Sequence, residues 1–190
     1  MTYRPITDTW FLARPKVKYY GAYPNGFLER ARALLGVSRT DQVLHVCGGM
    51  AKRYPAWTKL CPNDMTMDLD PVTSPDFLRD VTDALWPIWG EREPGWPAML
   101  CDPPYTVDDA KHYAPGVAVF PSANVLLRSA LAHVRPGGRV GMLHYLLPSP
   151  PRDAKFVAAV AVLVGYNNRI RCYSVFERIR ALKVQSARAW

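Results

Sequence analysis

The sequence predicts an α/β fold whose central sheet is mostly parallel and ends in a C-terminal antiparallel hairpin. Two observations lead to this prediction. Helical patterns alternate along the chain with short apolar runs that end in Asp or Gly, as in βαβ units. After the last such unit, two apolar runs separated by turn residues replace the alternation, which is typical of a hairpin.

Length and composition are those of one globular domain, which we expect to span residues 1–190. The chain has 190 residues, of which 49% are hydrophobic and 21% are charged, enough for a full core. No window approaches the roughly 18 apolar residues of a membrane span, and residues 1–5 do not lead into the apolar run expected of a signal peptide. The four cysteines form no Cys-x-x-Cys pair, which argues against a zinc ribbon or a disulfide framework. We therefore expect a soluble, cytoplasmic protein with reduced core thiols and no metal.

The first predicted elements are a helix over 24–35 and a strand over 42–46. Apolar residues recur at helical spacing in the first segment, and Gly36 supplies a C-cap. The strand runs directly into Cys47-Gly48-Gly49. Further along the chain we expect strands at Met65 to Asp68, Asp76 to Asp80 and Ala98 to Cys101, a helix from Ser122 to Val134 that Arg135 to Gly138 terminate, and a strand at Arg139 to Leu143. Most of these strands lead into polar, Gly or Pro residues, as is typical of the carboxyl edge of an open parallel sheet.

The hairpin is predicted from residues 156–176. Residues 156–164 form an almost unbroken apolar run, which pattern alone cannot assign to a helix or a strand. Residues 165–168 are turn formers, and residues 172–176 have the composition of a returning strand. We predict two antiparallel strands, and a helix over 156–164 is the alternative.

The most informative stretch is Asp102-Pro103-Pro104-Tyr105, which follows an apolar strand. The two prolines fix the backbone and remove two N–H donors, so that carbonyl groups project at the edge of the sheet. A carboxylate, a proline carbonyl and an aromatic face suit a planar group with an exocyclic amine. The amine donates to the acceptors, and the ring stacks on Tyr105. The alternative is a turn that ends the strand, with Asp102 as an N-cap.

With this motif and the segment Val43 to Met50, the chain resembles the S-adenosylmethionine-dependent amino-methyltransferases that act on nucleic-acid bases. Their signature is Asp/Asn/Ser-Pro-Pro-Tyr/Phe/Trp, and the resemblance covers residues 18 to about 178. It implies a Rossmann-like class I methyltransferase sheet with S-adenosylmethionine as the cofactor. It also implies a catalytic role for Asp102, Pro103, Pro104 and Tyr105: acceptors at Asp102 and the Pro103 carbonyl would orient the amine, Tyr105 would stack on the base, and no covalent nucleophile would be needed.

The resemblance further implies a set of cofactor-binding residues. They are Tyr20 in the aromatic segment before the first helix, Cys47, Gly48 and Gly49 in the loop after the first predicted strand, Asp68 for the ribose hydroxyls with Asp70 as its alternative, and Asp80 for the adenine amine of the cofactor with Asp83 as its alternative. Asp70 is expected instead to cap the next segment. The chain departs from the family at His45, where an acid is usual, and at Cys47, where Gly is usual.

The charge of the chain favours a polyanionic partner. Lys and Arg number 24 against 16 Asp and Glu, a formal net charge of +8. Arg169 and Arg171 in the predicted hairpin are candidates to hold phosphates, and solvated surface positions are the alternative for both. Candidates to line a base pocket are Tyr113, Phe120 and Tyr145, together with His112 and His144.

The predicted function is methylation of an exocyclic amine in DNA, with little sequence context. Adenine N6 is favoured over cytosine N4, because Asp before Pro-Pro favours adenine in the resembling family. We see no room for a separate target-recognition domain, so a homodimer or a partner subunit could supply recognition. An RNA base methyltransferase and a non-catalytic Rossmann-like subunit that binds nucleic acid are the alternatives.

Overall fold

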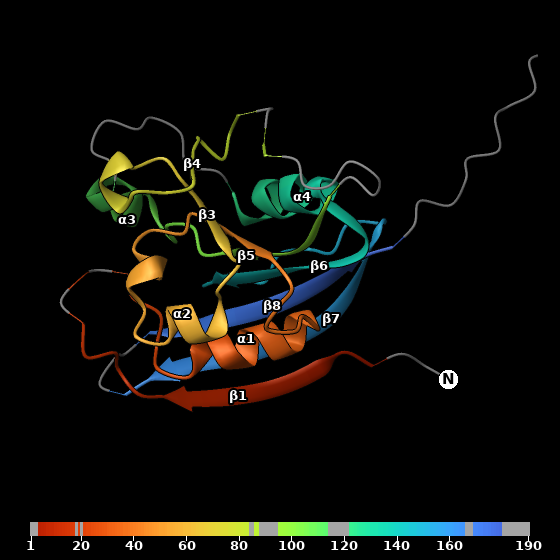
Figure 1. Ribbon diagram of the computed structural model, residues 1–190. Coiled ribbons are helices and arrows are strands. Elements are labelled where there is room, and N and C mark those ends of the chain that lie inside the picture. Colours follow the sequence, from red (N-terminus) through yellow and green to blue (C-terminus); the bar gives the residue numbers. More distant parts are fainter. Residues whose placement is uncertain are drawn as a thin grey trace, which may run out of the picture.

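The computed structural model describes residues 4–17, 19, 21–83, 86–87, 95–113, 122–165 and 169–179, without the side chain of residue 112. An eight-stranded sheet runs through them (Figure 1). Its strands are β1 (Ile6–Leu12), β2 (Val43–Val46), β3 (Met65–Asp68), β4 (Phe77–Leu78), β5 (Trp96–Cys101), β6 (Val134–His144), β7 (Ala154–Val164) and β8 (Ile170–Arg178). The helices are α1 (Phe27–Leu35), α2 (Trp57–Leu60), α3 (Val107–Tyr113) and α4 (Ala123–His133), with 3-10 turns η1 (Ala51–Arg53) and η2 (Pro71–Thr73).

The strand order is β1-β7-β8-β6-β5-β2-β3-β4, and it confirms the predicted fold class. In the part of the sheet formed by β6, β5, β2, β3 and β4, each strand pairs with its neighbour in parallel. Strand β8 is antiparallel to both β6 and β7. The apolar run at residues 156–164 lies within β7, so the helical alternative for it is wrong. Because β2, β3, β4, β5 and β6 share one direction, their carboxyl ends meet at one edge of the sheet.

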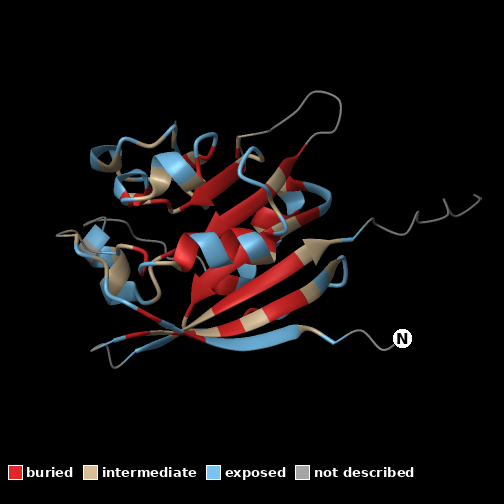
Figure 2. Cartoon of the chain, turned by 60° about the horizontal axis from the view of Figure 1, so that its bottom comes forward, coloured by how far each residue is buried: buried red, intermediate tan, exposed pale blue. Residues whose placement is uncertain are grey.

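Helices α1 and α4 cover opposite faces of the sheet (Figure 1). Helix α1 buries Phe27, Leu28, Ala31 and Leu35, and ends at Gly36, which adopts φ 68° and donates its N–H to the carbonyl of Ala33. This confirms the predicted C-cap. Helix α4 begins at Ser122, whose side chain accepts from the N–H of Val125, and it buries Ala123, Leu126, Leu127, Ala130 and Leu131. Each apolar stripe packs on its own side of the sheet, and Figure 2 shows that the central strands of the sheet are mostly buried.

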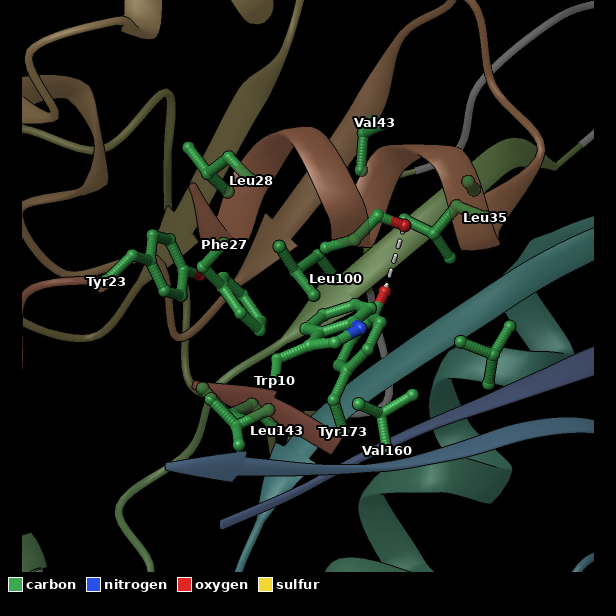
Figure 3. Close-up of a cluster of buried hydrophobic side chains, with 14 of the residues drawn as sticks. Trp10, Tyr23, Phe27, Leu28, Leu35, Val43, Leu100, Leu143, Val160 and Tyr173 are labelled. Atoms are coloured by element: carbon green, nitrogen blue, oxygen red, sulfur yellow. Dashed lines mark hydrogen bonds between the residues drawn. The ribbon is translucent and has the colours of Figure 1, made fainter. Parts of the chain in front are cut away.

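The core under α1 is aromatic (Figure 3). Trp10 of β1 packs against Phe27 and Tyr173, with ring centroids 6.3 and 5.8 Å apart respectively. Tyr173 of β8 lies across β6 and donates its hydroxyl to the carbonyl of Ala31, 3.3 Å away. This crossing requires Gly141 on β6, because a Cβ there would lie 2.3 Å from the Tyr173 hydroxyl. The aromatic layer therefore ties α1, β1 and β8 together.

Three parts of the fold differ from the sequence-based prediction. Strand β1 was not predicted: it pairs in parallel with β7 at the edge of the sheet and buries only Trp10 and Leu12. Strand β4 has two residues, so Asp80 lies beyond its end and not on it. Strand β6 begins at Val134, directly after α4, and residues 135–138 form an irregular stretch before pairing with β5 resumes at Arg139.

A charged cluster is buried between α1, β2 and the start of β3. Asp64 forms an ion pair with Arg32 of α1, and its Oδ2 lies 3.0 Å from Nε2 of His45 on β2. Its other oxygen accepts from the N–H of Val43 at 3.1 Å. Burial alone would raise the pKa of Asp64, but the hydrogen bonds from His45 and Arg32 hold it below the ordinary value. Although Cys61 lies close enough to make a three-residue metal-ligand set with His45 and Asp64, the guanidinium of Arg32 already neutralises the carboxylate. We therefore assign the cluster a structural role.

Candidate active site

The predicted Asp102-Pro103-Pro104-Tyr105 motif lies in a pocket of about 470 Å³ at the carboxyl edge of the sheet. The pocket is built from segments far apart in the chain: the stretch before α1, the loop after β5, helix α3, and the adjoining ends of β6, β7 and β8. Its lining residues are Arg14, Pro15, Val17, Tyr19, Gly21, Ala22, Pro24, Asp102, Pro103, Pro104, Tyr105, Asp109, Tyr113, Tyr145, Val164, Gly165, Arg169 and Arg171. The structure thus brings the four predicted catalytic residues and both predicted arginines to one place.

Asp102 is the acidic group of this pocket. Its N–H donates to the carbonyl of Val46 at 3.1 Å, so the end of β5 is joined to the end of β2. Its Oδ1 accepts from the hydroxyl of Tyr105 at 2.6 Å. Burial raises the pKa of Asp102 to about 6, although the Tyr105 hydrogen bond and the charge of Arg171 oppose the rise. Asp102 is therefore an anion, and an acceptor, above about pH 6.

Aromatic rings form one wall of the pocket. The ring of Tyr105 lies 4.6 Å from that of Tyr145 and meets His144 edge to face at 5.5 Å. Tyr113 of α3 also lines the pocket, as the sequence predicts for Tyr113 and Tyr145. Phe120 lies outside the described residues. Flat ring faces beside a carboxylate suit a planar ligand that carries a hydrogen-bond donor.

The two predicted phosphate-binding arginines lie in different environments. Arg169 precedes β8 at the rim, where its side chain is 59% exposed. It donates to the hydroxyl of Tyr145 at 3.0 Å and lies over that ring. Arg171, on β8 and opposite Val162 of β7, is partly buried and lines the same pocket as Tyr105 and Asp102, and its charge acts on both. Arg169 is thus open to solvent, whereas Arg171 belongs to the interior of the pocket.

The loop after β2 lies beside the end of β3. The N–H of Gly48 donates to the carbonyl of Met67, and the N–H of Gly49 donates to Oδ2 of Asp68 at 2.7 Å. A Cβ built on Gly49 would meet nothing within 4 Å, so the loop borders open space at this point. The carboxylate of Asp68 and the glycine loop therefore adjoin.

Cys47 adopts a left-handed backbone conformation, with φ 54°. A side chain is disfavoured there, which gives a physical reason for Gly at this position in the resembling family. We expect Cys47→Gly to be more stable than Cys47→Ala by about 1 kcal/mol in urea unfolding, because only Gly relieves the strain. Equal stability of the two variants would contradict this reading of the loop.

The remaining residues predicted to bind the cofactor lie outside the strands or outside the described part of the chain. Asp80 lies beyond β4, where its Oδ1 accepts from the N–H and the hydroxyl of Thr82. Asp70 accepts from the N–H of Val72 and caps η2, which confirms its expected capping role. Tyr20 lies outside the described residues, although its neighbours Tyr19 and Gly21 line the pocket.

The sequence did not single out Tyr23, which lies near Asp102. Tyr23, just before α1, is buried, and its hydroxyl has no hydrogen-bond partner within the described part of the chain. It stacks on Phe27, and burial together with the charge of Asp102 raises its pKa well above the ordinary value. The sequence feature that could have indicated Tyr23 is its position in the same aromatic segment as Tyr20.

The comparison with solved structures identifies the fold. TrmN from Thermus thermophilus matches with a TM-score of 0.60 and 20% identity over 84% of this chain. A coclaurine N-methyltransferase bound to N-methylheliamine and SAH matches with a TM-score of 0.51 and 10% identity over 85% of this chain and 76% of its own. The fold is that of the class I S-adenosylmethionine-dependent methyltransferases. MtNAS in complex with S-adenosylmethionine matches with a TM-score of 0.50 and 11% identity over 81% of this chain and 61% of its own.

These likenesses concern the methyltransferase fold. The chain spans 50% of the length of TrmN. Neither a family model nor a curated protein sequence matches it. Within the described residues, no helix has the length and apolar character needed to cross a membrane.

Proposed function

We propose that this methyltransferase fold transfers a methyl group from S-adenosylmethionine to an exocyclic amine of a DNA base, in particular adenine N6. The observation that carries the proposal is the placement of Asp102-Pro103-Pro104-Tyr105 at the end of β5, with the carboxylate and the aromatic ring in one pocket. Two methyltransferase-fold neighbours hold S-adenosylmethionine or SAH, which supports the cofactor.

The residues at the ends of β2 and β3 fit such a cofactor. Open space lies beside Gly49, and Asp68 presents a carboxylate next to it. Both oxygens of Asp68 accept from backbone N–H groups, those of Gly49 and Asp70, and each oxygen keeps a further lone pair for a ribose hydroxyl. When bound, S-adenosylmethionine supplies an electrophilic methyl group. Asp80 would accept a hydrogen bond from the adenine amine of the cofactor. The segment around Tyr20 would pack against the cofactor.

The pocket addresses the main difficulty of the reaction. An exocyclic amine is a poor nucleophile because its lone pair is delocalised into the ring. Asp102 and the carbonyl of Pro103 would accept its two hydrogens, which favours a pyramidal nitrogen with a localised lone pair. Pro104 fixes the loop, and Tyr105 would hold the base by stacking, worth about 1–3 kcal/mol.

A nucleic-acid substrate agrees with the charge of the chain. The net charge is +8, and Arg14 and Arg169 line the pocket that would receive the base. Recognition outside the target base would then rest chiefly on phosphates, unless a second copy or a partner subunit supplies it. DNA is the proposed polymer, and RNA is an outcome of the test.

The experiment that tests the function is transfer of a labelled methyl group from S-adenosylmethionine to duplex DNA, single-stranded DNA and RNA, with calorimetric titration of the cofactor alongside. We expect micromolar cofactor binding and incorporation into DNA. Incorporation into RNA alone would show that the substrate is RNA and not DNA. Absence of cofactor binding would overturn the enzymatic function in favour of a non-catalytic nucleic-acid-binding subunit.

Asp68→Ala should weaken S-adenosylmethionine binding by about 1–3 kcal/mol, the range for a hydrogen bond to a charged acceptor. Calorimetric titration measures the change, and Asp70→Ala is the matched control because Asp70 caps η2. If Asp70→Ala weakens binding and Asp68→Ala does not, the ribose contact belongs to Asp70.

A further inference from the structure

We infer that Arg171 is a positioning residue that forms a charged triad with Tyr105 and Asp102 and keeps Asp102 available as the acceptor for the amine. The inference rests on the proposed function, because it assigns Asp102 that task. It also gives Arg171 a part inside the reaction site in place of contact with phosphate.

The register of the sheet directs Arg171 toward Asp102. Side chains alternate along β8, so Arg171 shares a face with Tyr173, whose hydroxyl contacts α1 on that face. On β5, Leu100 packs in the same core, and Asp102 follows it two residues later at the edge. β6 lies between these strands, and Arg171 reaches the pocket that Asp102 lines.

The three side chains line one pocket, and a hydrogen bond joins two of them. The hydroxyl of Tyr105 donates to Oδ1 of Asp102 at 2.6 Å, and Arg171 lines the same pocket beside this pair. No described residue donates to Oδ2 of Asp102. The arrangement fixes the carboxylate through one oxygen and leaves the other open to an amine.

Arg171 also balances the charge around Asp102. Titratable or charged groups that line the pocket with Asp102 are Arg14, Tyr105, Asp109, Tyr113, Tyr145, Arg169 and Arg171, and Tyr23 and the thiols of Cys47 and Cys101 also lie near its carboxylate. Within the described part of the chain, Arg171 is the cation whose charge lowers the pKa of Asp102 against the effect of burial.

The loss of this charge has a defined chemical consequence. Burial would then raise the pKa of Asp102 further, and a larger share of the carboxyl would be protonated at neutral pH. A protonated carboxyl donates through one oxygen, so it is a poorer acceptor for an amine. Removal of Arg171 should therefore move the acid limit of the reaction to higher pH, and not merely lower the rate.

The direct test is a carbon-13 NMR titration of the Asp102 carboxyl in the whole protein, with Asp102→Asn used to assign the signal. We expect a midpoint near 6 in the wild type and a midpoint about one pH unit or more higher in Arg171→Met. Arg169→Met, the matched control at the rim, should leave the midpoint unchanged. An unchanged midpoint in Arg171→Met would overturn the inference, and Arg171→Gln repeats the test if Arg171→Met does not fold.

The pH dependence of methyl transfer is the second readout. The rate of Arg171→Met should fall at neutral pH and recover toward the wild-type rate at alkaline pH, whereas Arg171→Lys should keep an acid limb close to that of the wild type. A loss that is equal at every pH would indicate a merely structural role and would overturn the inference. Because the NMR titration needs no methyl transfer, it decides the role of Arg171 even if the proposed function fails.

Discussion

Asp102→Ala is expected to abolish methyl transfer while S-adenosylmethionine binds as tightly as to the wild type. The reason is that the Asp102 carboxylate faces the pocket with Tyr105, whereas the predicted ribose contact lies at Asp68 on another strand. Labelled methyl transfer and calorimetric titration of the cofactor measure the two effects separately. Turnover near the wild-type value would show that the amine is not held by Asp102.

Asp102→Asn is the informative companion variant. The amide keeps an acceptor oxygen of the same shape but does not titrate, and Asn also occurs at this position in the signature of the resembling family. In the wild type, the share of ionised Asp102 falls as the pH drops through about 6, so transfer should decline there. Asp102→Asn should retain part of the activity and lose this acid limb. An acid limb that persists would have to come from another group.

Asp64→Ala is expected to destabilise the fold by about 3–5 kcal/mol, because it leaves the buried guanidinium of Arg32 without its counter-charge. It also removes the acceptor of the Val43 N–H and the partner of His45. Urea unfolding at neutral pH measures the loss.

Asp108→Ala is the matched control for this change. Asp108 pairs with Lys111 on the surface of α3, where its side chain is 91% exposed. We expect its removal to cost less than about 0.5 kcal/mol. If Asp64→Ala costs no more than Asp108→Ala, the buried cluster does not stabilise the fold as inferred.

The elements that could be predicted from sequence are those with a complete local pattern. Strand β3 has the bounds predicted, and β2 and β5 lie at the predicted positions, because each is an apolar run that ends at a turn former or an acid. Strand β1 contains Thr7, Asp8 and Thr9, and only residues near its end are buried. Its sequence therefore lacks the apolar run by which the other strands could be predicted. Its place beside β7 depends on tertiary pairing.

The same limit applies to the site. The Asp102 motif could be found because its chemistry lies within four consecutive residues. The role of Arg171 could not be predicted, because it depends on tertiary pairing. Strand β6 lies between β8 and β5, and no local pattern encodes the register that places Arg171 near Asp102. The burial of Tyr23 likewise follows from the packing of α1 on the sheet.

The central claim is that an exocyclic amine held at Asp102 receives the methyl group, and the position of the transferred group tests it most directly. DNA treated with the protein and with methyl-deuterated S-adenosylmethionine is digested to nucleosides and analysed by mass spectrometry. We predict label on N6 of deoxyadenosine with the wild type and none with Asp102→Ala. Label on a ring carbon or a ring nitrogen, or equal label with Asp102→Ala, would contradict the account.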